Sequence, residues 1–245
     1  MTSVAAKRAP AAPAGAERTG VLQAVWADAG EPTAEVSTEE IRQILADGSA
    51  IVVDTRSVAE FAAGHLPGVR HIPTRADGPA EQYVEAVEKL VGGSKDTALV
   101  LYCNGPYCKR TRSLGRHLAA TGFTNVRRYQ LGIPIWRALG GPTEIELDGV
   151  LRVHRDDRSA VFFDARAPRD YASGTLFGAH SVPAEGLPGS LAKAPLPRDD
   201  FHARVVLFGE DFAQARALAE ALSVTPFHNI LYFPGTYQAL AAAAK

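Results

Sequence analysis

The chain has 245 residues, of which 46% are hydrophobic and 22% are charged, and its formal net charge at pH 7 is -1. This composition is that of a globular protein of one or two domains, and such a small charge gives no electrostatic reason to expect nucleic acid or a membrane as a partner. No apolar run approaches the roughly 20 residues of a membrane-spanning helix. The 2 cysteines lie close together, which excludes a disulfide framework and favours a reducing compartment or a dedicated redox pair.

Residues 1–34 predict a flexible leader. They are dominated by Ala, Pro, Gly and Thr, and Lys7 and Arg8 are not followed by the compact apolar segment of a secretory signal. We therefore expect a cytoplasmic protein. The texture changes after this leader, where Ser37 and the acidic residues behind it predict a helix with an apolar face that begins at Ile41.

The segment that follows, up to residue 142, alternates short apolar runs with helical patterns. The run at 50–54 is β-branched and bounded by turn signals, which is typical of a buried parallel strand. The same reasoning predicts strands at 98–102 and 126–129, helices at 56–63, 83–91 and 111–120, and a last short helix after Gly132. Strands that alternate with helices indicate an α/β domain with a mainly parallel sheet flanked by helices.

The second half of the chain repeats this plan. The run 160–166 mirrors 51–56, the segment 178–183 mirrors 68–73, and 205–209 mirrors 99–103, with Gly209 in the place of Cys103. Internal similarity of this kind indicates two domains of one architecture. We therefore predict α/β domains at 35–142 and 143–245.

Both cysteines lie in the loop that follows the strand at 98–102. Cys103 comes directly after the strand, a Gly-Pro turn comes next, and a helix is predicted to begin near Thr111. Helix N-termini, backbone N–H groups and nearby cations lower the pKa of a thiol from about 8.5 into the ~3.5–7.5 range, and the thiolate is the nucleophilic form of cysteine. The loop offers a helix N-terminus, backbone N–H groups and two cations, Lys109 and Arg110, which precede the predicted helix. Cys103 is therefore the candidate nucleophile.

Several motifs are spaced along the first half of the chain: Asp54-Thr55-Arg56, Glu60-Phe61, the segment 64–68, Cys103 at the end of its strand, Gly122-Phe123 and the segment 132–136. Together they resemble the rhodanese family of sulfurtransferases. The resemblance covers most of residues 36–142, and the second half resembles a degenerate copy, as in tandem rhodaneses. It implies two rhodanese-like α/β domains, of which the first is active. The second, with Glu210-Asp211 after Gly209, is expected to be catalytically silent.

The resemblance also implies a mechanism. The Cys103 thiolate would attack the outer sulfur of a donor such as thiosulfate, and a thiol or cyanide would take that sulfur from the resulting persulfide. Backbone N–H groups of the loop would form an anion-binding nest beside the positive end of the helix. We therefore expect the substrate, without a cofactor or a metal, to be bound by the loop residues Asn104, Gly105, Pro106, Tyr107, Cys108, Lys109 and Arg110.

The loop departs from most single-domain rhodaneses because the stretch from Cys103 to Gly122 is longer. Relatives with longer loops include arsenate reductases and phosphatases, and the phosphatases place an arginine where Arg110 stands, so an oxyanion enzyme is one alternative. A non-enzymatic persulfide carrier or redox sensor is another. In that case Cys108 would form a disulfide with Cys103, although Cys108 could equally point inward beneath the loop.

Other residues of the motifs receive structural interpretations. Asp54 and Arg56 are expected to hold the domain together, His65 to hydrogen-bond within its turn, and Trp26 and Trp136 to pack. The second domain is expected to cover one side of the loop, which would create a cleft at the domain interface, or to bind a partner protein.

Overall fold

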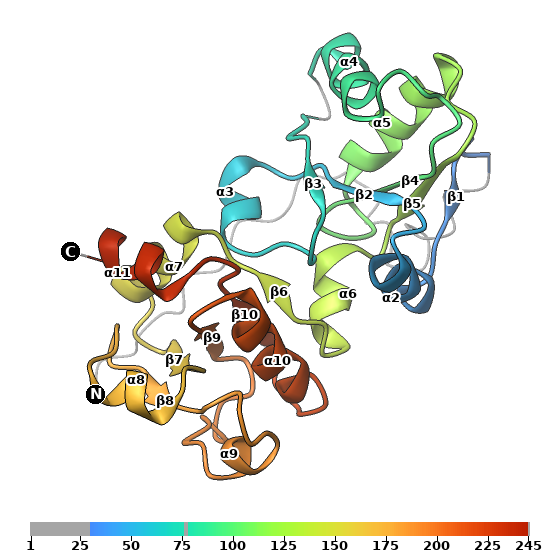
Figure 1. Cartoon of the computed structure of the whole chain (residues 1–245). Helices are drawn as coiled ribbons and strands as arrows, with labels where there is room; N and C mark the ends of the chain where they lie inside the picture. The colour runs from blue at the N-terminus through green and yellow to red at the C-terminus, as the bar shows by residue number, and fades with distance from the viewer. Residues whose placement is uncertain (1–29, 76–77, 245) are drawn as a thin grey trace, which may run out of the picture.

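The structure is a computed structural model in which residues 30–75 and 78–244 are described. They form two five-stranded sheets with the same strand order, β1-β5-β4-β2-β3 in the first domain and β6-β10-β9-β7-β8 in the second. Every strand pair within the two sheets is parallel, and helices cover the sheets (Figure 1). The predicted fold of two rhodanese-like α/β domains is confirmed.

The first domain contains the predicted strands and helices with small shifts at their ends. Its elements are β1 (Ala34–Glu35), α2 (Thr38–Asp47), β2 (Ile51–Asp54), α3 (Val58–Ala62), β3 (Arg70–His71), α4 (Ala80–Leu90), β4 (Leu99–Tyr102), α5 (Lys109–Ala120), β5 (Val126–Tyr129) and α6 (Gly132–Ala138). Both α2 and α3 begin with a capping box, in which a serine and the glutamate three residues later satisfy each other's backbone N–H groups.

The second domain repeats this order. Its elements are β6 (Thr143–Glu144), α7 (Leu147–Asp156), β7 (Val161–Asp164), α8 (Pro168–Ala172), β8 (His180–Ser181), α9 (Gly189–Ala192), β9 (Arg204–Phe208), α10 (Phe212–Leu222), β10 (Asn229–Tyr232) and α11 (Tyr237–Ala243).

The end of the predicted leader belongs to the first domain. Residues 1–29, with Trp26, lie outside the described residues, but Ala34 is part of β1 and Thr33 is buried. Arg128 of β5 donates hydrogen bonds to the hydroxyl of Thr33 at 2.6 Å and to its carbonyl at 3.0 Å. The segment is therefore held at the edge of the sheet by contacts that its composition does not reveal.

Each sheet has a separate hydrophobic core on each face, because successive side chains of a strand point to opposite faces. On β4, Leu99 and Leu101 pack with α4 and α5, whereas Val100 and Tyr102 pack with α2 and α6. The second sheet is covered by α9 and α10 on one face and by α7 and α11 on the other. This burial on both faces explains why the strands read as continuous apolar runs.

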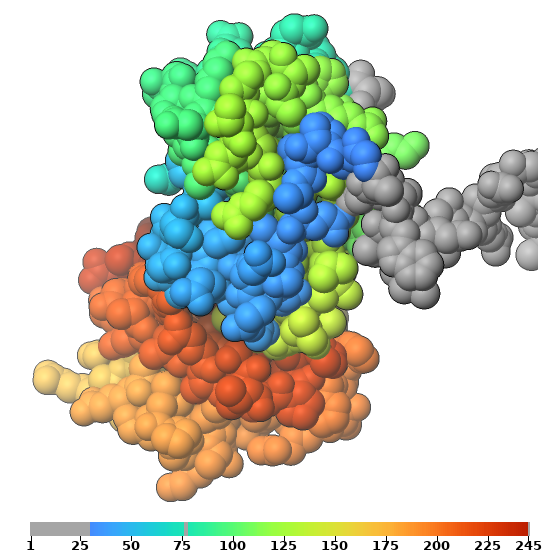
Figure 2. Space-filling model, turned by 90° about the vertical axis from the view of Figure 1, so that its right-hand side faces the viewer, coloured from blue at the N-terminus to red at the C-terminus, as the bar shows by residue number. Residues whose placement is uncertain are grey.

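The two domains pack against each other (Figure 2). His65 and Glu144 form an antiparallel bridge, with two N–H···O bonds of 2.9 Å, and the His65 Nε2 atom lies 3.3 Å from a carboxylate oxygen of Glu144. Ala62 at the end of α3 accepts a further bond from the N–H of Glu146 at 3.1 Å. The junction thus joins β6 of the second domain to the turn after α3. No helix in the described ranges is long and apolar enough to cross a membrane.

Candidate active site

Cys103 stands at the carboxyl end of β4, one of the central strands of the first sheet, and only 2% of its surface is exposed. The loop that it opens ends at Cys108, the N-cap residue of α5. The helix therefore begins at Lys109, two residues before the predicted start, because the backbone of Cys108 takes the extended conformation of an N-cap. Strand, loop and helix follow one another as the sequence predicts.

The two cysteines form a disulfide. Their Cα atoms are 6.3 Å apart, within the usual range of about 4.4–6.8 Å. The loop is thus in an oxidised state in which neither sulfur is a free nucleophile. Of the two arrangements left open for Cys108, the structure has the one in which Cys108 forms a disulfide with Cys103.

Gln130, the residue just after β5, binds the loop through its side-chain amide. Its amide nitrogen lies 3.3 Å from the carbonyl oxygen of Gly105 and 3.2 Å from those of Pro106 and Cys108. The amide oxygen accepts bonds from the hydroxyl of Thr111 at 3.0 Å and from Arg128 at 2.9 Å. Gln130 is 2% exposed, and its polar character directly after a buried strand was the one signal that could have identified it.

The start of α6 fixes the loop from another side. The N–H group of Ile133 donates to the carbonyl oxygen of Cys103 at 3.1 Å. Gly132 has a φ of +65°, and a Cβ atom there would clash with the backbone of Cys103 and Gly105. Glycine is therefore required at this close approach.

The backbone N–H groups of the loop remain available to a ligand. Those of Asn104, Gly105, Lys109 and Arg110 have no acceptor within the described ranges. Because three carbonyl groups of the loop are bound to Gln130, the N–H groups and the positive end of α5 give the loop an excess of donors. This is the electrostatic character of an anion-binding loop.

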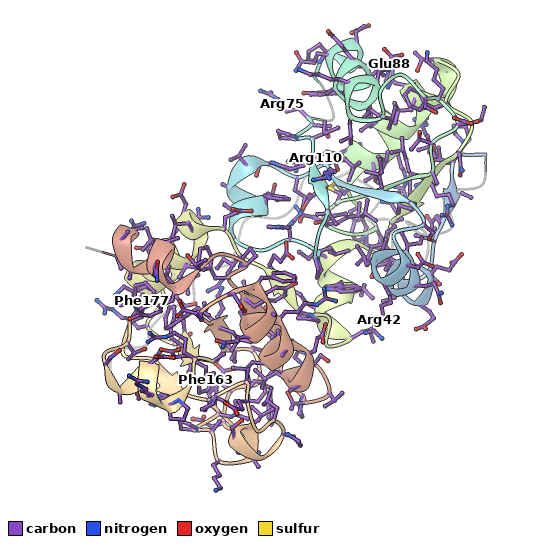
Figure 3. All side chains as sticks on the ribbon, viewed as in Figure 1. Arg42, Arg75, Glu88, Arg110, Phe163 and Phe177 are labelled. Atoms are coloured by element: carbon purple, nitrogen blue, oxygen red, sulfur yellow. A yellow bond between two sulfur atoms is a disulfide. The ribbon has the colours of Figure 1, made fainter. Side chains whose placement is uncertain are left out.

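Arg110 is ion-paired with Glu60, the third residue of α3. The guanidinium of Arg110, which is labelled in Figure 3, lies 3.0 Å from the Glu60 carboxylate. This carboxylate also accepts a bond from the side chain of Asn104. Partial burial alone would raise the pKa of Glu60, but hydrogen bonds from Ser57, Arg110 and Asn104 bring it down to about 2. Part of the positive charge that the sequence predicted for substrate is thus neutralised by Glu60.

The other predicted loop residues differ in their exposure. Gly105 is buried and Pro106 half-buried, whereas Asn104 and Lys109 are exposed and Tyr107 is 56% exposed. The loop therefore presents its polar and aromatic side chains outward and its glycine inward. None of the described residues forms a cluster of His, Cys, Asp and Glu that could hold a metal ion.

The structural interpretations of the flanking motifs are confirmed. Arg56 donates to Asp54 at 2.6 Å and to the carbonyl oxygen of Gly64 at 2.8 Å, and both charged groups are buried. The Nδ1–H group of His65 donates to the carbonyl oxygen of Phe61, 3.0 Å away, as expected for its turn, and the ring also contacts the second domain. Trp136 is 5% exposed and packs in the core.

The expected cleft at the domain interface is present beside the loop. It has a volume of about 600 Å³. Arg56, Glu60, Asn104 and Arg137 contribute from the first domain, and His202, His228 and Asn229 from the second. A cavity of this size accommodates a small organic ligand.

Comparisons with known proteins agree with this architecture. A model of the rhodanese-like domain matches residues 37–139. Human thiosulfate:glutathione sulfurtransferase is 36% identical over 103 residues, which are 40% of this chain and 88% of that protein. The HTH-type transcriptional regulator Rv0324 of Mycobacterium tuberculosis is 29% identical over 115 residues, 47% of this chain and 46% of that protein.

The tRNA uridine(34) hydroxylase of Erwinia tasmaniensis is 33% identical over 107 residues, 43% of this chain and 29% of that protein. The chain thus spans less than half the length of the regulator and of the hydroxylase, but most of the length of the human sulfurtransferase. Since that last similarity covers nearly a whole protein, the chain belongs to the rhodanese family.

Proposed function

We propose that the protein is a sulfurtransferase that carries sulfane sulfur as a persulfide on Cys103. The observation that supports this most is the position of Cys103, at the carboxyl end of β4 and in a loop where the N–H groups of Asn104, Gly105, Lys109 and Arg110 have no acceptor in the described part of the chain. The similarity to a sulfurtransferase over 88% of that protein's length supports the same reaction class. The donor is thiosulfate or a related sulfane compound, and the acceptor is a thiol or cyanide.

The reaction begins once a thiol reductant has opened the Cys103–Cys108 disulfide. The Cys103 thiolate attacks the outer sulfur of thiosulfate, a new S–S bond forms, and sulfite leaves with the electron pair of the broken S–S bond. An acceptor thiolate then attacks the outer sulfur of the persulfide, and the Cys103 thiolate leaves. Two displacements through a covalent intermediate give ping-pong kinetics.

The loop stabilises both charged states in this scheme. The N–H groups of Asn104, Gly105, Lys109 and Arg110, which have no acceptor in the described ranges, would donate to the negative charge that develops beside Cys103, and the start of α5 adds its positive end. Asn104 and Arg110 also hold Glu60, so they act on the substrate through the shape of the loop as well as through their own donors.

The test is a side-by-side activity assay on the reduced protein with thiosulfate, an aryl phosphate and arsenate as substrates. We expect turnover with thiosulfate and cyanide, none with the two other oxyanions, and complete loss of activity in Cys103→Ser. Arg169→Met, at the surface of the second domain, is the control and should keep full activity. Equal activity in Cys103→Ser, or turnover of the aryl phosphate alone, contradicts the proposal.

The disulfide favours a second function, that of a persulfide carrier or redox sensor. In this scheme the Cys108 thiolate attacks the inner sulfur of the Cys103 persulfide, sulfide leaves as HS⁻, and the observed disulfide forms. A dithiol reductant then restores both thiols. After polysulfide or peroxide treatment, mass spectrometry should find the linked cysteines in the wild-type protein and a persistent persulfide or sulfenic acid in Cys108→Ser. Absence of any species that links or modifies the two thiols excludes this role.

The second domain has no cysteine, and in the proposed function it takes no part in the chemistry. Its contribution is one wall of the cleft beside the loop, through His202 and His228, or a surface for a partner protein. We place the protein in the cytoplasm, where a reductant keeps the loop open.

A further inference from the structure

The cleft between the domains contains a charged group that the sulfur transfer described above does not use. Arg137 lies on α6, one helical turn after Ile133, whose N–H group binds the carbonyl oxygen of Cys103. Residues four apart lie on the same face of a helix, about 5–6 Å from each other. The guanidinium therefore lies on the side of α6 that borders the loop, and it lines the cleft together with Asn104.

Arg137 has no partner for its charge. Its Nε atom is buried and makes no hydrogen bond, and no ion pair to its guanidinium occurs within residues 30–75 and 78–244. Burial, followed by repulsion from Arg56 and Arg204, lowers the pKa of Arg137 to about 10, so the side chain is still charged at neutral pH. A Cβ atom at Gly64 would overlap the guanidinium, so this glycine leaves the space that the side chain occupies.

The other charges of the cleft are compensated. Arg56 is paired with Asp54 at 2.6 Å, and Glu60 is paired with Arg110 at 3.0 Å. Opposite them, the rings of His202 and His228 lie 5.3 Å apart at the starts of β9 and β10. These contacts leave the cleft with one net positive charge, on Arg137, and with further N–H donors from the imidazole rings. Arg137 is half-buried, and a charge that has lost part of its hydration is stabilised when a ligand supplies the counter-charge.

We propose that the cleft binds the carboxylate of the acceptor thiol and that Arg137 is the residue that pairs with it. The inference rests on the sulfurtransferase function proposed above. The guanidinium fork matches a carboxylate with two parallel hydrogen bonds. Asn104, the residue after Cys103, lines the same cleft, so an acceptor with its carboxylate at Arg137 would extend its thiol toward the loop. A volume of about 600 Å³ is far larger than thiosulfate needs and suits a thiol of amino-acid to short-peptide size.

The first test compares two acceptors with thiosulfate as the donor. 3-Mercaptopropionate carries a carboxylate, and 2-mercaptoethanol does not. For Arg137→Met we expect the KM for 3-mercaptopropionate to rise by roughly 10- to 100-fold, the range for loss of a charged hydrogen-bonded pair, while the KM for 2-mercaptoethanol stays within about twofold. Arg137→Lys, which keeps the charge but not the fork, should give an intermediate KM.

Arg127→Met is the matched control. Its Nε atom is also buried without a hydrogen bond, but it lines a different depression, beside Glu40 and Gln43 of α2, so neither KM should change. Equal rises in both KM values for Arg137→Met, or no rise in either, overturn the inference. A circular dichroism melt of each variant shows whether it folds, and Arg137→Lys serves if Arg137→Met does not.

The second test separates this inference from the proposed function. 3-(Methylthio)propionate has the carboxylate but cannot accept sulfur, and calorimetry measures its binding to the reduced full-length chain without any turnover. We expect binding that weakens at least ~10-fold in Arg137→Met. Binding that does not depend on Arg137, or no binding, overturns the inference even if sulfur transfer occurs. Failure of thiosulfate to form a persulfide contradicts the proposed function instead, whichever way the probe binds.

Discussion

The two domains of this protein share a scaffold down to individual hydrogen bonds, yet they differ completely in the loop where chemistry is expected. In the first domain, Arg56 lies 2.6 Å from Asp54 and 2.8 Å from the carbonyl of Gly64. In the second, Arg166 lies 2.7 Å from both Asp164 and the carbonyl of Gly174. The arrangement of strands and this buried ion pair are therefore properties of the fold and not of the candidate site.

The loops after the central strands differ in length, charge and packing. Cys103 precedes its N-cap residue by five positions, whereas Gly209 precedes the N-cap residue Asp211 by two. A Cβ atom at Gly209 would lie 2.8 Å from the Cβ of Gln214, which leaves no room for a cysteine. Asp211 also caps its helix with its own carboxylate, which accepts from the Gln214 N–H at 3.0 Å.

The support beneath the loop is also missing from the second domain. In the strand register, Arg128 of β5 lies opposite Glu35 of β1, and Tyr232 of β10 lies opposite Glu144 of β6. Arg128 and Tyr232 are therefore equivalent, and Pro234, two residues after Tyr232, stands at the position of Gln130. Proline has no side-chain donor, and the second loop has no equivalent of the amide that binds three carbonyl groups in the first. The candidate site thus consists of a scaffold that both domains share and of a long loop, bound by an amide, that only the first domain has.

The largest effect is expected where the domains agree. Asp54→Ala and Asp164→Ala each leave a buried arginine without its partner, so each should lower the free energy of unfolding of its domain by about 3–5 kcal/mol. Urea unfolding followed by circular dichroism measures both. A loss of stability in only one of the two variants would contradict the inference that the two ion pairs are equivalent.

The next effect tests the amide beneath the loop. Gln130→Leu removes an amide that contacts three loop carbonyl groups and the side chains of Thr111 and Arg128. Stability should therefore fall by about 2 kcal/mol and turnover with thiosulfate by roughly 10- to 100-fold as the loop shifts. Gln214→Leu is the matched control, since its amide oxygen accepts from the N–H of Glu210 at 3.0 Å in the second loop. It should leave turnover unchanged. Equal turnover in wild type and Gln130→Leu contradicts the role given to this amide.

A smaller effect is expected from restoring the missing cysteine. Gly209→Cys introduces side-chain atoms into a packed loop, which should lower stability by about 1–3 kcal/mol. Combined with Cys103→Ser, it should give no sulfur transfer, because the second loop lacks both the length and the amide support. Measurable sulfur transfer in the double variant would show that a cysteine at this edge of the sheet is sufficient. It would contradict the inference that the length of the loop and its amide support are required.

The smallest effect is expected in the pH dependence of the free energy of unfolding. The pKa of Glu60 is lowered from 4.5 to about 2, so its contribution to stability is complete above about pH 4.5 and is lost as the pH falls through about 2. Stability of Glu60→Gln should therefore depend less on pH in this window than that of the wild type. Arg110→Met should move the loss to higher pH, because it removes one of the groups that lower this pKa. Urea unfolding between pH 2 and 6 checks both expectations, and identical curves for all three proteins contradict them.

Local patterns in the sequence predicted what depends on neighbouring residues. The strands at 51–54, 99–102 and 126–129 were found because both of their faces are buried and apolar. The start of α4 at Ala80 was missed by three residues, since Pro79 as N-cap gives no side-chain signal. The repeat predicted the second domain because its strands and turns follow the same order.

The contacts that shape the candidate site were beyond the sequence because they join distant residues. Gln130 reaches back to the loop across more than twenty residues, and Glu60 reaches forward to Arg110. The sequence placed the positive charges of Lys109 and Arg110 near Cys103, but it could not show that a carboxylate from α3 would pair with Arg110. The unpaired charge of Arg137 was equally hidden, because the cleft that it lines is formed by distant residues of both domains.

The most direct test of the central claim is to locate the transferred sulfur. The reduced protein is treated with thiosulfate, freed of small molecules, and measured by intact-mass spectrometry with peptide mapping. We expect the mass of the wild type and of Cys108→Ser to rise by one sulfur atom, which peptide mapping assigns to Cys103, and the mass of Cys103→Ser to stay unchanged. Sulfur on Cys108 in Cys103→Ser, or no added sulfur in any of the three proteins, would contradict the assignment of Cys103 as the sulfur carrier.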